Sequence, residues 1–276
     1  MERWQRRRIL IWGKTRPEVS KKYREIVCTG GVFEDTRRLV RIYPVPLRYM
    51  DDSRIFKKYQ WIEAEVMKAP SDPRPESYKI RYSNIRVLGT IPSEKGNWDA
   101  RARWVMNPEN IFSSVETLKL KQRKDKTSLG LVKPKEILDI QAVPYSDEEQ
   151  ERFWAKYQEA IQQMELPLDF GKDHTVKPLR PPDYRFRITF RCDDHECSTH
   201  RMSVLDWEVD ALYFNLRQRG DSAEVAVEKV IDKLHKICGP DKDLYFFLGN
   251  IASHPQVFSI VGFWWPKKKK QLELGI

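Results

Sequence analysis

The sequence predicts an α+β protein with a mainly β N-terminal part and a small α+β unit at its C-terminal end. Short runs rich in Ile, Val, Tyr and Trp, separated by Pro, Gly and Asp, dominate residues 1–145. From residue 184 to residue 276 the expected order changes to β-α-α-β-β. Between them, residues 146–183 hold one expected helix and a Pro-rich stretch, 166–183, which predicts a linker.

The N-terminal strands are short, and only one helix interrupts them, which is typical of small β-barrels rather than of a doubly wound sheet. The segment Trp61–Met67 shows the pattern, because Ile62, Ala64 and Val66 share one face of a half-buried strand. The other strands are expected at Ile9–Trp12, Leu39–Val45, Tyr78–Tyr82, Ile85–Thr90, Leu129–Val132 and Ile137–Val143.

Four helices are expected from their start and stop signals. Asn107 followed by Pro108 is typical of a first helical turn, and Ser146 with Glu149 forms a capping box. Ser203 is expected to cap a third helix, and a second capping box pairs Asp221 with Glu224. The four expected helices begin at Asn107, Ser146, Ser203 and Asp221 and end near Lys121, Met164, Arg219 and Cys238.

The C-terminal unit opens with a strictly alternating strand at Tyr184–Arg191. Its aromatic and aliphatic residues are expected to face a core, while Arg185, Arg187 and Arg191 face outward. The last two strands are expected at Asp243–Gly249 and Val257–Trp265.

Charge and cysteine content narrow the class of partner. The chain of 276 residues has a net charge of +10 and a pI of about 9.3, and such a surplus attracts polyanions, most often nucleic acid. A basic surface that serves only solubility is the alternative. No apolar run is long enough to span a membrane. Four cysteines are too few for a disulfide scaffold, so a cytoplasmic protein is expected.

Three blocks of the N-terminal part resemble a known family. KTRPEVSKKYREIVCTGG (Lys14–Gly31), LVRIYPVPLR (Leu39–Arg48) and DPRPESYK (Asp72–Lys79) are similar to the dual OB-containing domain family of bacteria. The resemblance covers mainly the first 145 residues and carries no catalytic signature. It implies two OB-like barrels and nucleic-acid recognition. It also implies an accessory role beside other protein subunits in an antiviral defence or mobile-element system.

Aromatic residues interleave with Arg and Lys along this part of the chain. OB-type barrels bind single strands by combining a positive groove with aromatic faces on which bases stack. The alternative is that these Tyr and Trp side chains pack in the core or rim of the barrel. From charge and aromatic adjacency, the expected nucleic-acid contacts are Arg41, Arg48, Lys57, Lys58, Tyr59 and Arg81.

The stretch RCDDHECSTHRMSVLDWE (Arg191–Glu208) gathers donors that suit zinc, namely Cys192, Cys197 and His200. Ligands this close in sequence seldom surround one ion by themselves, so the fourth is expected from a separate element. Cys238, at the end of the last helix, completes the expected structural zinc site. The alternative is a turn with buried cysteines, surface histidines and no metal.

The same stretch also offers carboxylates that hold Mg²⁺ in nucleases. The candidates are Asp193, Asp194, Asp206, Glu208 and Asp210. On a helix, Asp206 and Asp210 share a face and Glu208 points away, so only part of the set can converge.

Three classes of function therefore stay open. The leading expectation is a nucleic-acid-binding protein that recognises or positions DNA or RNA and performs no chemistry itself. The second is a divalent-metal nuclease that uses Asp194, His200, Asp206 or Glu208. The third is a protein-interaction adaptor whose basic charge is incidental.

Overall fold

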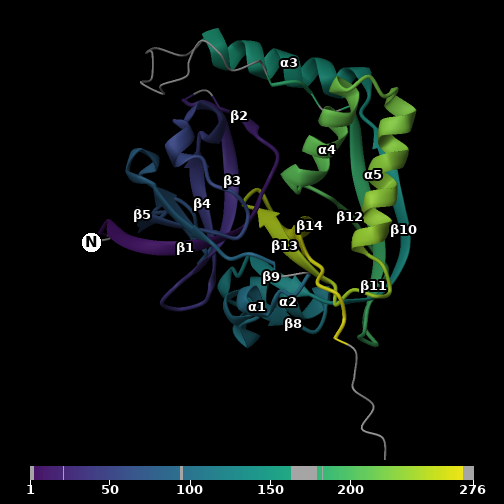
Figure 1. Cartoon of the computed structure of the whole chain (residues 1–276), viewed down its shortest axis with the longest axis horizontal. Helices are drawn as coiled ribbons and strands as arrows, with labels where there is room; N and C mark the ends of the chain where they lie inside the picture. The colour runs from purple at the N-terminus through teal and green to yellow at the C-terminus, as the bar shows by residue number, and fades with distance from the viewer. Residues whose placement is uncertain (1–2, 21, 94–95, 163–178, 182, 270–276) are drawn as a thin grey trace, which may run out of the picture.

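The computed structural model describes residues 3–20, 22–93, 96–162, 179–181 and 183–269. Figure 1 shows a strand-rich N-terminal part beside an α+β part, with helix α3 (Asp147–Gln162) lying across the top of both. Most of the Pro-rich stretch predicted as a linker lies outside the described residues. Among those described, no helix has the length and apolar character needed to cross a membrane.

The N-terminal part is a closed barrel with the strand order of an OB fold. Strand β5 pairs back onto β1 and closes a ring of β1 (Gln5–Lys14), β3 (Arg24–Phe33), β4 (Leu39–Val45), β6 (Ser77–Ile80) and β5 (Gln60–Lys68). Strands β4 and β6 run parallel, and the other pairs in the ring are antiparallel. This Greek-key order is typical of OB-type barrels, and it confirms the expected α+β class and barrel architecture.

Two short strands and three 3-10 turns extend the barrel. Strand β2 pairs with β3, and β7 pairs with β5. These strands span Glu18–Ser20 and Arg86–Thr90, and the turns span Leu47–Tyr49, Asp52–Arg54 and Tyr82–Asn84.

The interior of the barrel follows from the alternation in its strands. Ile62, Ala64 and Val66 are buried and the residues between them are not, as the period of two predicts. These three side chains belong to one core with Ile9 and Ile11 of β1, so the predicted inward face of β5 is confirmed.

One barrel, rather than the two expected, closes within the described residues. The last two strands expected in the N-terminal part pair with C-terminal strands instead: β9 (Leu129–Val132) with β13 (Tyr245–Ile251), and β10 (Pro134–Pro144) with β11 (Tyr184–Cys192). All four residues of β9 are buried, so this strand needs neighbours on both faces, and it obtains them inside the larger C-terminal sheet.

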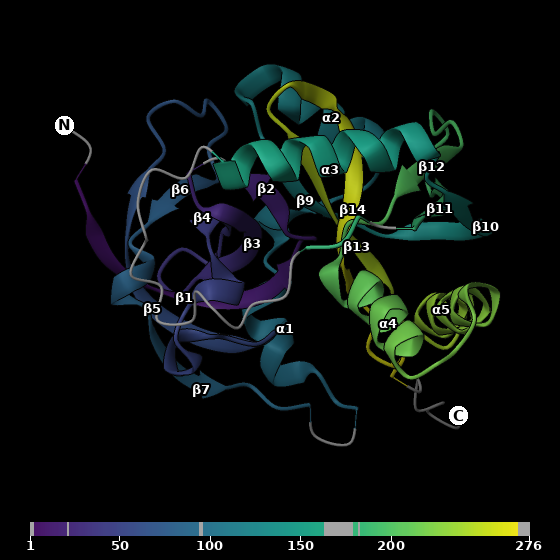
Figure 2. The same cartoon turned by 90° about the horizontal axis from the view of Figure 1, so that it is seen from above.

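The C-terminal part consists of two sheets and two helices around one core. A four-stranded sheet has the order β14-β13-β9-β8, and a three-stranded sheet has the order β10-β11-β12. The two helices lie side by side, as Figures 1 and 2 both show. The elements not yet bounded are β8 (Ile111–Phe112), β12 (His200–Ser203), α4 (Trp207–Gln218), α5 (Ala223–Ile237) and β14 (His254–Trp264).

Two predicted features of this part are confirmed. Phe186, Ile188 and Phe190 of β11 are buried, while Arg185, Arg187 and Arg191 are more exposed. At the start of α3, the Glu149 carboxylate accepts from the Ser146 N–H and the Ser146 hydroxyl accepts from the Glu149 N–H, which is the predicted capping box.

The other helix starts differ from the prediction. Asn107 begins only a 3-10 turn, Pro108–Asn110, and α2 (Val115–Asp125) starts later at a reciprocal cap between Ser114 and Thr117. The short helix α1 (Asp99–Val105) was not predicted. Periodic patterns cannot separate two consecutive short elements, which explains the merged prediction.

The caps of α4 and α5 were also predicted wrongly. Ser203 ends strand β12, and Asp206 caps α4 by accepting from the Glu208 N–H. Ser222, rather than Asp221, caps α5 by accepting from the Val225 N–H. Ser and Asp are equally good capping residues, so neighbouring candidates are not distinguished by type.

A third core joins the barrel to the C-terminal part. The ring of Trp12 on β1 stacks on Phe247 of β13, with centroids 4.1 Å apart and planes 2° from parallel. The Trp12 indole N–H donates to the Gly31 carbonyl at 2.8 Å. The same core contains Leu10 from the barrel and Trp264 from β14.

Ion pairs with buried carboxylates at Asp206 and Asp210 cross the same junction. The Arg16 guanidinium donates twice to the Asp210 carboxylate of α4, at 2.7 and 2.8 Å. The Lys58 ammonium lies 3.3 Å from Asp206 and 3.1 Å from Glu208. The barrel and the C-terminal part are therefore held together by apolar packing and by paired charges.

We predict that Gly30→Ala destabilises the protein by about 1–3 kcal/mol, because it overpacks the core. A Cβ atom at Gly30 would lie 2.2 Å from the Trp12 ring, which is locked by Phe247. Gly89→Ala is the control, since a Cβ there meets nothing within 4 Å. Urea unfolding of both variants measures the difference, and equal midpoints would contradict the tight packing of Trp12.

We also predict that Asp210→Asn costs about 3–5 kcal/mol, because it leaves the Arg16 charge buried without its partner. The matched control is Glu109→Gln, which breaks an exposed pair with Arg38 that also joins the two parts. The Asp210 side chain is 4% exposed and that of Glu109 is 59% exposed, so the control should cost about 1 kcal/mol or less. Similar losses in the two variants would show that the Arg16 pair is not sequestered from water.

Candidate functional site

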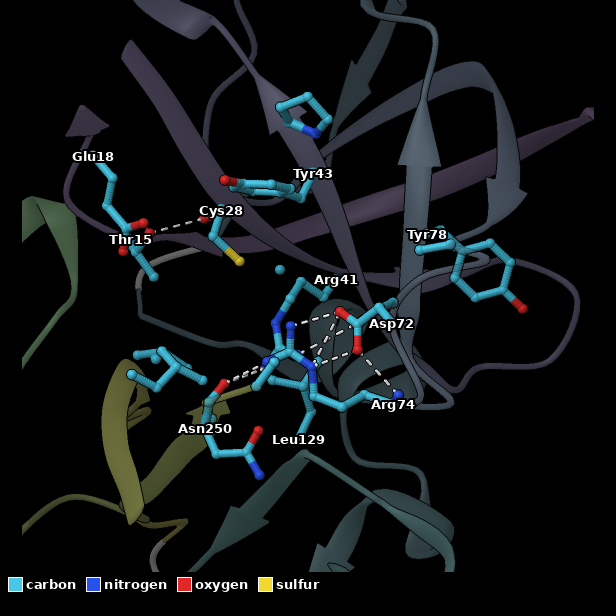
Figure 3. A pocket seen from close by; sticks show the side chains of 18 of the residues that line it. Thr15, Glu18, Cys28, Arg41, Tyr43, Asp72, Arg74, Tyr78, Leu129 and Asn250 are labelled. Carbon is cyan, nitrogen blue, oxygen red and sulfur yellow. Dashed lines mark hydrogen bonds and ion pairs between the residues drawn. The ribbon is translucent and has the colours of Figure 1, made fainter. Parts of the chain in front are cut away.

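A pocket of about 670 Å³ opens between the barrel and the hairpin formed by β13 and β14 (Figure 3). Strands β3 and β4 contribute Cys28 and Arg41 to its lining. Thr15, from the segment after β1, and Asp72, from the loop between β5 and β6, come from opposite sides. Asn250 and other residues of the hairpin complete the lining, so the pocket exists only when both parts of the chain are assembled.

Arg41 connects the barrel to the C-terminal part within this pocket. Its guanidinium donates to the Ser128 hydroxyl at 3.0 Å and to the Asn250 carbonyl at 3.1 Å. Burial lowers the pKa of Arg41 from its ordinary value. The side chain is therefore a fixed, buried cation at the bottom of the pocket.

Asp72 and Arg74 form a second fixed pair at the pocket wall. The Arg74 guanidinium donates to both carboxylate oxygens of Asp72, at 2.8 and 2.6 Å, and also to the Asn250 carbonyl at 2.8 Å. Burial alone would raise the pKa of Asp72, but the hydrogen bonds from Arg74 outweigh it and hold that pKa below its ordinary range. The loop between β5 and β6 is thereby anchored to the hairpin.

Exposed apolar and aromatic side chains gather at the pocket. Tyr43, Ile251 and Val257 line it and are 41%, 52% and 61% exposed. Burial of its hydroxyl and the nearby Glu18 raise the pKa of Tyr43 to about 12, so the ring stays neutral near pH 7. Large exposed apolar groups brought together around a concave surface are typical of a binding site.

Polar groups complete the lining. Lys79 on β6 is exposed, and Lys14 on β1 donates to the Phe56 carbonyl at 3.0 Å. Burial raises the pKa of Glu18 and lowers the pKa of Lys14. The Asn250 side-chain oxygen is buried and has no hydrogen-bond partner among the described residues. The pocket thus combines cations, an aromatic face and a buried acceptor.

The six predicted nucleic-acid contacts are not brought onto one surface. Arg41 lines the pocket, but Lys58 is only partly exposed and is paired with Asp206 and Glu208. Tyr59 is 4% exposed and packs against Trp98 and Trp264, which leaves its ring no surface to offer a base. Lys58 and Tyr59 instead fill the junction between the two parts of the chain.

The other three predicted contacts lie outside the pocket. Arg48 donates to the buried Glu25, and Arg81 pairs with Glu65 on the exposed side of β5. Lys57 is exposed but does not line the pocket. Tyr43 belongs to the interleaved aromatic and basic residues but was not among the six predicted contacts, although its spacing of two from Arg41 in a strand places both on one face.

Three of the four predicted metal ligands do come together. Donor atoms of Cys192, Cys197 and His200 lie within 4.8 Å of one another, and the fourth member of the group is Glu116 of α2 rather than Cys238. Cys238 packs against the C-terminal core, and burial raises the pKa of its thiol to about 12. No local pattern marks Glu116, because only the tertiary fold brings α2 to the loop between β11 and β12.

The carboxylates proposed for a nuclease are paired with basic side chains, and Asp206 and Glu208 share Lys58. Asp206 caps α4 and pairs with Lys58, Asp210 binds Arg16, and Asp193 lies 2.7 Å from the Lys135 ammonium. Across the described parts of the chain, one group brings three or more His, Cys, Asp or Glu donor atoms close enough to share a metal ion. It consists of Glu116, Cys192, Cys197 and His200 and contains none of these aspartates. The geometry therefore gives no support to a centre built from Asp206 and Glu208.

The Asp72–Arg74 pair predicts acid sensitivity. Unfolded Asp72 has its ordinary pKa of 3.8, whereas the folded pKa is lower. Below about pH 4 the unfolded chain therefore binds more protons, and the stabilisation by Asp72, fully present above that pH, is lost as the pH falls. We expect Asp72→Asn to be less stable than the wild type at pH 7 and the gap in thermal midpoint to narrow towards pH 3. A gap independent of pH would contradict the assignment.

Comparison with known protein families divides the chain in two. Residues 5–107 match DUF8758 and residues 111–275 match DUF8757, each described as a domain of unknown function. A comparison with curated proteins finds no match. The first match covers the barrel and α1, and the second begins at β8, where the chain enters the C-terminal sheets.

The resemblance to the dual OB-containing domain family stays a prediction. Because the second match covers more than half of the sequence, the chain belongs to the DUF8757 family, and the region that precedes this match is similar to DUF8758.

Proposed function

We propose that the chain binds single-stranded nucleic acid in the pocket between the barrel and the β13–β14 hairpin. The pocket lies over β3 and β4, between the segment after β1 and the loop between β5 and β6. In OB barrels, the corresponding strand face and loops bind oligonucleotides. The single observation that carries the proposal is the gathering of Tyr43, Ile251 and Val257, exposed, beside cations at this face.

The lining suits a nucleotide strand in each of its chemical parts. The exposed face of Tyr43 offers a stacking surface, and Ile251 and Val257 offer apolar contact to the edge of a base. Lys79, which is exposed and lines the pocket, would meet a phosphate. The orphaned Asn250 side-chain oxygen would accept a hydrogen bond from a base N–H.

Unpaired bases fit this site better than a duplex does. A pocket of about 670 Å³, bounded by the barrel, two connecting segments and a hairpin, admits bases that are splayed from a strand. In a duplex the base faces are stacked on one another and are not free to lie on Tyr43. The net charge of +10 adds long-range attraction that does not depend on sequence.

Tyr43→Ala tests the stacking surface. Loss of one stacked base, worth about 1–3 kcal/mol, weakens binding about 5- to 150-fold. Trp154→Ala is the matched control, because Trp154 is another exposed aromatic residue but lies on α3 outside the pocket. Anisotropy of a labelled single strand of about 12 nucleotides, a length within the range one OB fold covers, gives both affinities. Equal weakening in the two variants would contradict the assigned face.

Lys79→Ala tests the phosphate contact. We expect weaker binding and a slope of log affinity against log salt that is smaller by about 0.7. Lys57→Ala is the control, since that lysine is exposed but outside the pocket. If Lys57→Ala instead changes the slope and Lys79→Ala does not, the strand binds elsewhere. If the wild type binds no DNA or RNA strand at low salt, the function is not nucleic-acid binding.

A further inference from the structure

The loop between β11 and β12 brings two cysteines and a histidine together. Strand β11 ends at Cys192 and β12 begins at His200, with Cys197 in the turn between them. The Cys192 N–H donates to the Cys197 sulfur at 3.0 Å, and that sulfur lies 3.3 Å from the His200 Nε2 atom. Local backbone geometry therefore directs three soft donors towards one point.

Helix α2 supplies a fourth donor from a distant part of the chain. Glu116 lies in the first turn of α2, and its Oε1 atom is 3.0 Å from the His200 Nε2 atom. Its Oε2 atom is buried and has no hydrogen-bond partner within the described residues. A buried, unpartnered carboxylate oxygen is costly, and the Glu116 carboxylate belongs to a donor group that contains two thiols, so a cation bound there would satisfy it.

The spacing of the donors matches the coordination shell of zinc. Tetrahedral zinc, with bonds of about 2.3 Å to sulfur and about 2.0 Å to nitrogen and oxygen, separates its ligand atoms by roughly 3.3–3.8 Å. The distances from His200 Nε2, 3.3 Å to Cys197 and 3.0 Å to Glu116, are close to this range, and all four donor atoms lie within 4.8 Å of one another.

We propose that Glu116, Cys192, Cys197 and His200 bind one zinc ion as a structural site. Four protein ligands fill a tetrahedral shell and leave no position for a reacting water, which is the arrangement of structural rather than catalytic zinc. Mixed sulfur and imidazole donors favour zinc over magnesium or calcium, which prefer oxygen. As the ion binds, the two thiols release their protons.

The ion would join two segments that pack in one core. Val115 and Leu118 of α2 contact the same apolar cluster as Phe190 and Cys192 of β11. Zinc would therefore fix the start of α2 against the turn between β11 and β12, and none of the four donors lines the pocket proposed for nucleic acid.

Metal analysis of the full-length protein, purified without chelators from zinc-supplemented cells, tests the proposal. We expect about one zinc ion per chain in the wild type and little in Cys197→Ser or His200→Ala. Cys238→Ser is the matched control, because that cysteine is also partly buried but lies outside the donor group, and it should retain the metal. Zinc-free wild-type protein, or equal loss in Cys238→Ser and Cys197→Ser, would overturn the assignment.

Glu116→Gln distinguishes the fourth ligand. The cobalt-substituted wild type should show sulfur-to-metal charge-transfer bands and the intense d–d absorption of a tetrahedral site. In Glu116→Gln we expect a changed d–d spectrum and affinity weaker by at least about tenfold, which is the lower end of losses seen for supporting residues of metal sites. An unchanged spectrum and affinity would remove Glu116 from the site.

Two further measurements do not depend on the variants folding. A chelator should lower the thermal midpoint of the wild type, and adding zinc back should restore it. A midpoint insensitive to both would overturn a structural zinc site.

Mass spectrometry after thiol labelling should find Cys192 and Cys197 as free thiols once zinc is removed. A disulfide between them in freshly purified protein would replace the zinc proposal. None of these readouts involves nucleic acid, so they stand apart from the proposed function.

Discussion

The stack of Trp12 on Phe247 is the contact on which the rest of the molecule depends. It places the outer face of barrel strand β1 against strand β13, and the surrounding side chains form a core shared by both parts of the chain. Burying two large aromatic rings in one contact supplies apolar stabilisation and a fixed geometry. Gly30 lies so close to the Trp12 ring that a Cβ atom there would clash with it. The missing side chain of Gly30 therefore makes room for the Trp12 ring against the barrel.

That docking creates the pocket. With β13 held against the barrel, the Asn250 carbonyl reaches both Arg41 and Arg74, and the hairpin closes a surface that would otherwise be an open barrel face. Arg41 and Arg74 satisfy the Asn250 carbonyl, which would otherwise need water as a hydrogen-bond donor. The same hydrogen bonds hold the pocket wall in position. The proposed binding site is thus a property of the assembled chain rather than of its barrel alone.

The same junction shows why net charge is a weak guide to individual contacts. Several basic residues of the barrel are neutralised inside the protein, where Arg16 binds Asp210 and Lys58 binds Asp206. The carboxylates that resembled a catalytic set serve as their counter-charges. Burial makes such pairing necessary, because a buried charge without a partner carries a desolvation cost that nothing offsets. The cations left at the surface, such as Lys79, are the ones available to a ligand.

The sequence by itself determined the features that depend on neighbouring residues. Alternation predicted the buried faces of β5 and β11, the Ser146 capping box was read correctly, and three donors of the Cys/His group stand within one short loop. Tertiary structure alone decided which strands pair, since periodicity reports that a face is buried but not what covers it. It placed β9 beside β13 rather than in a second barrel, and Glu116 rather than Cys238 beside His200. Both choices depend on contacts between residues far apart in the chain, whose energies no local pattern records.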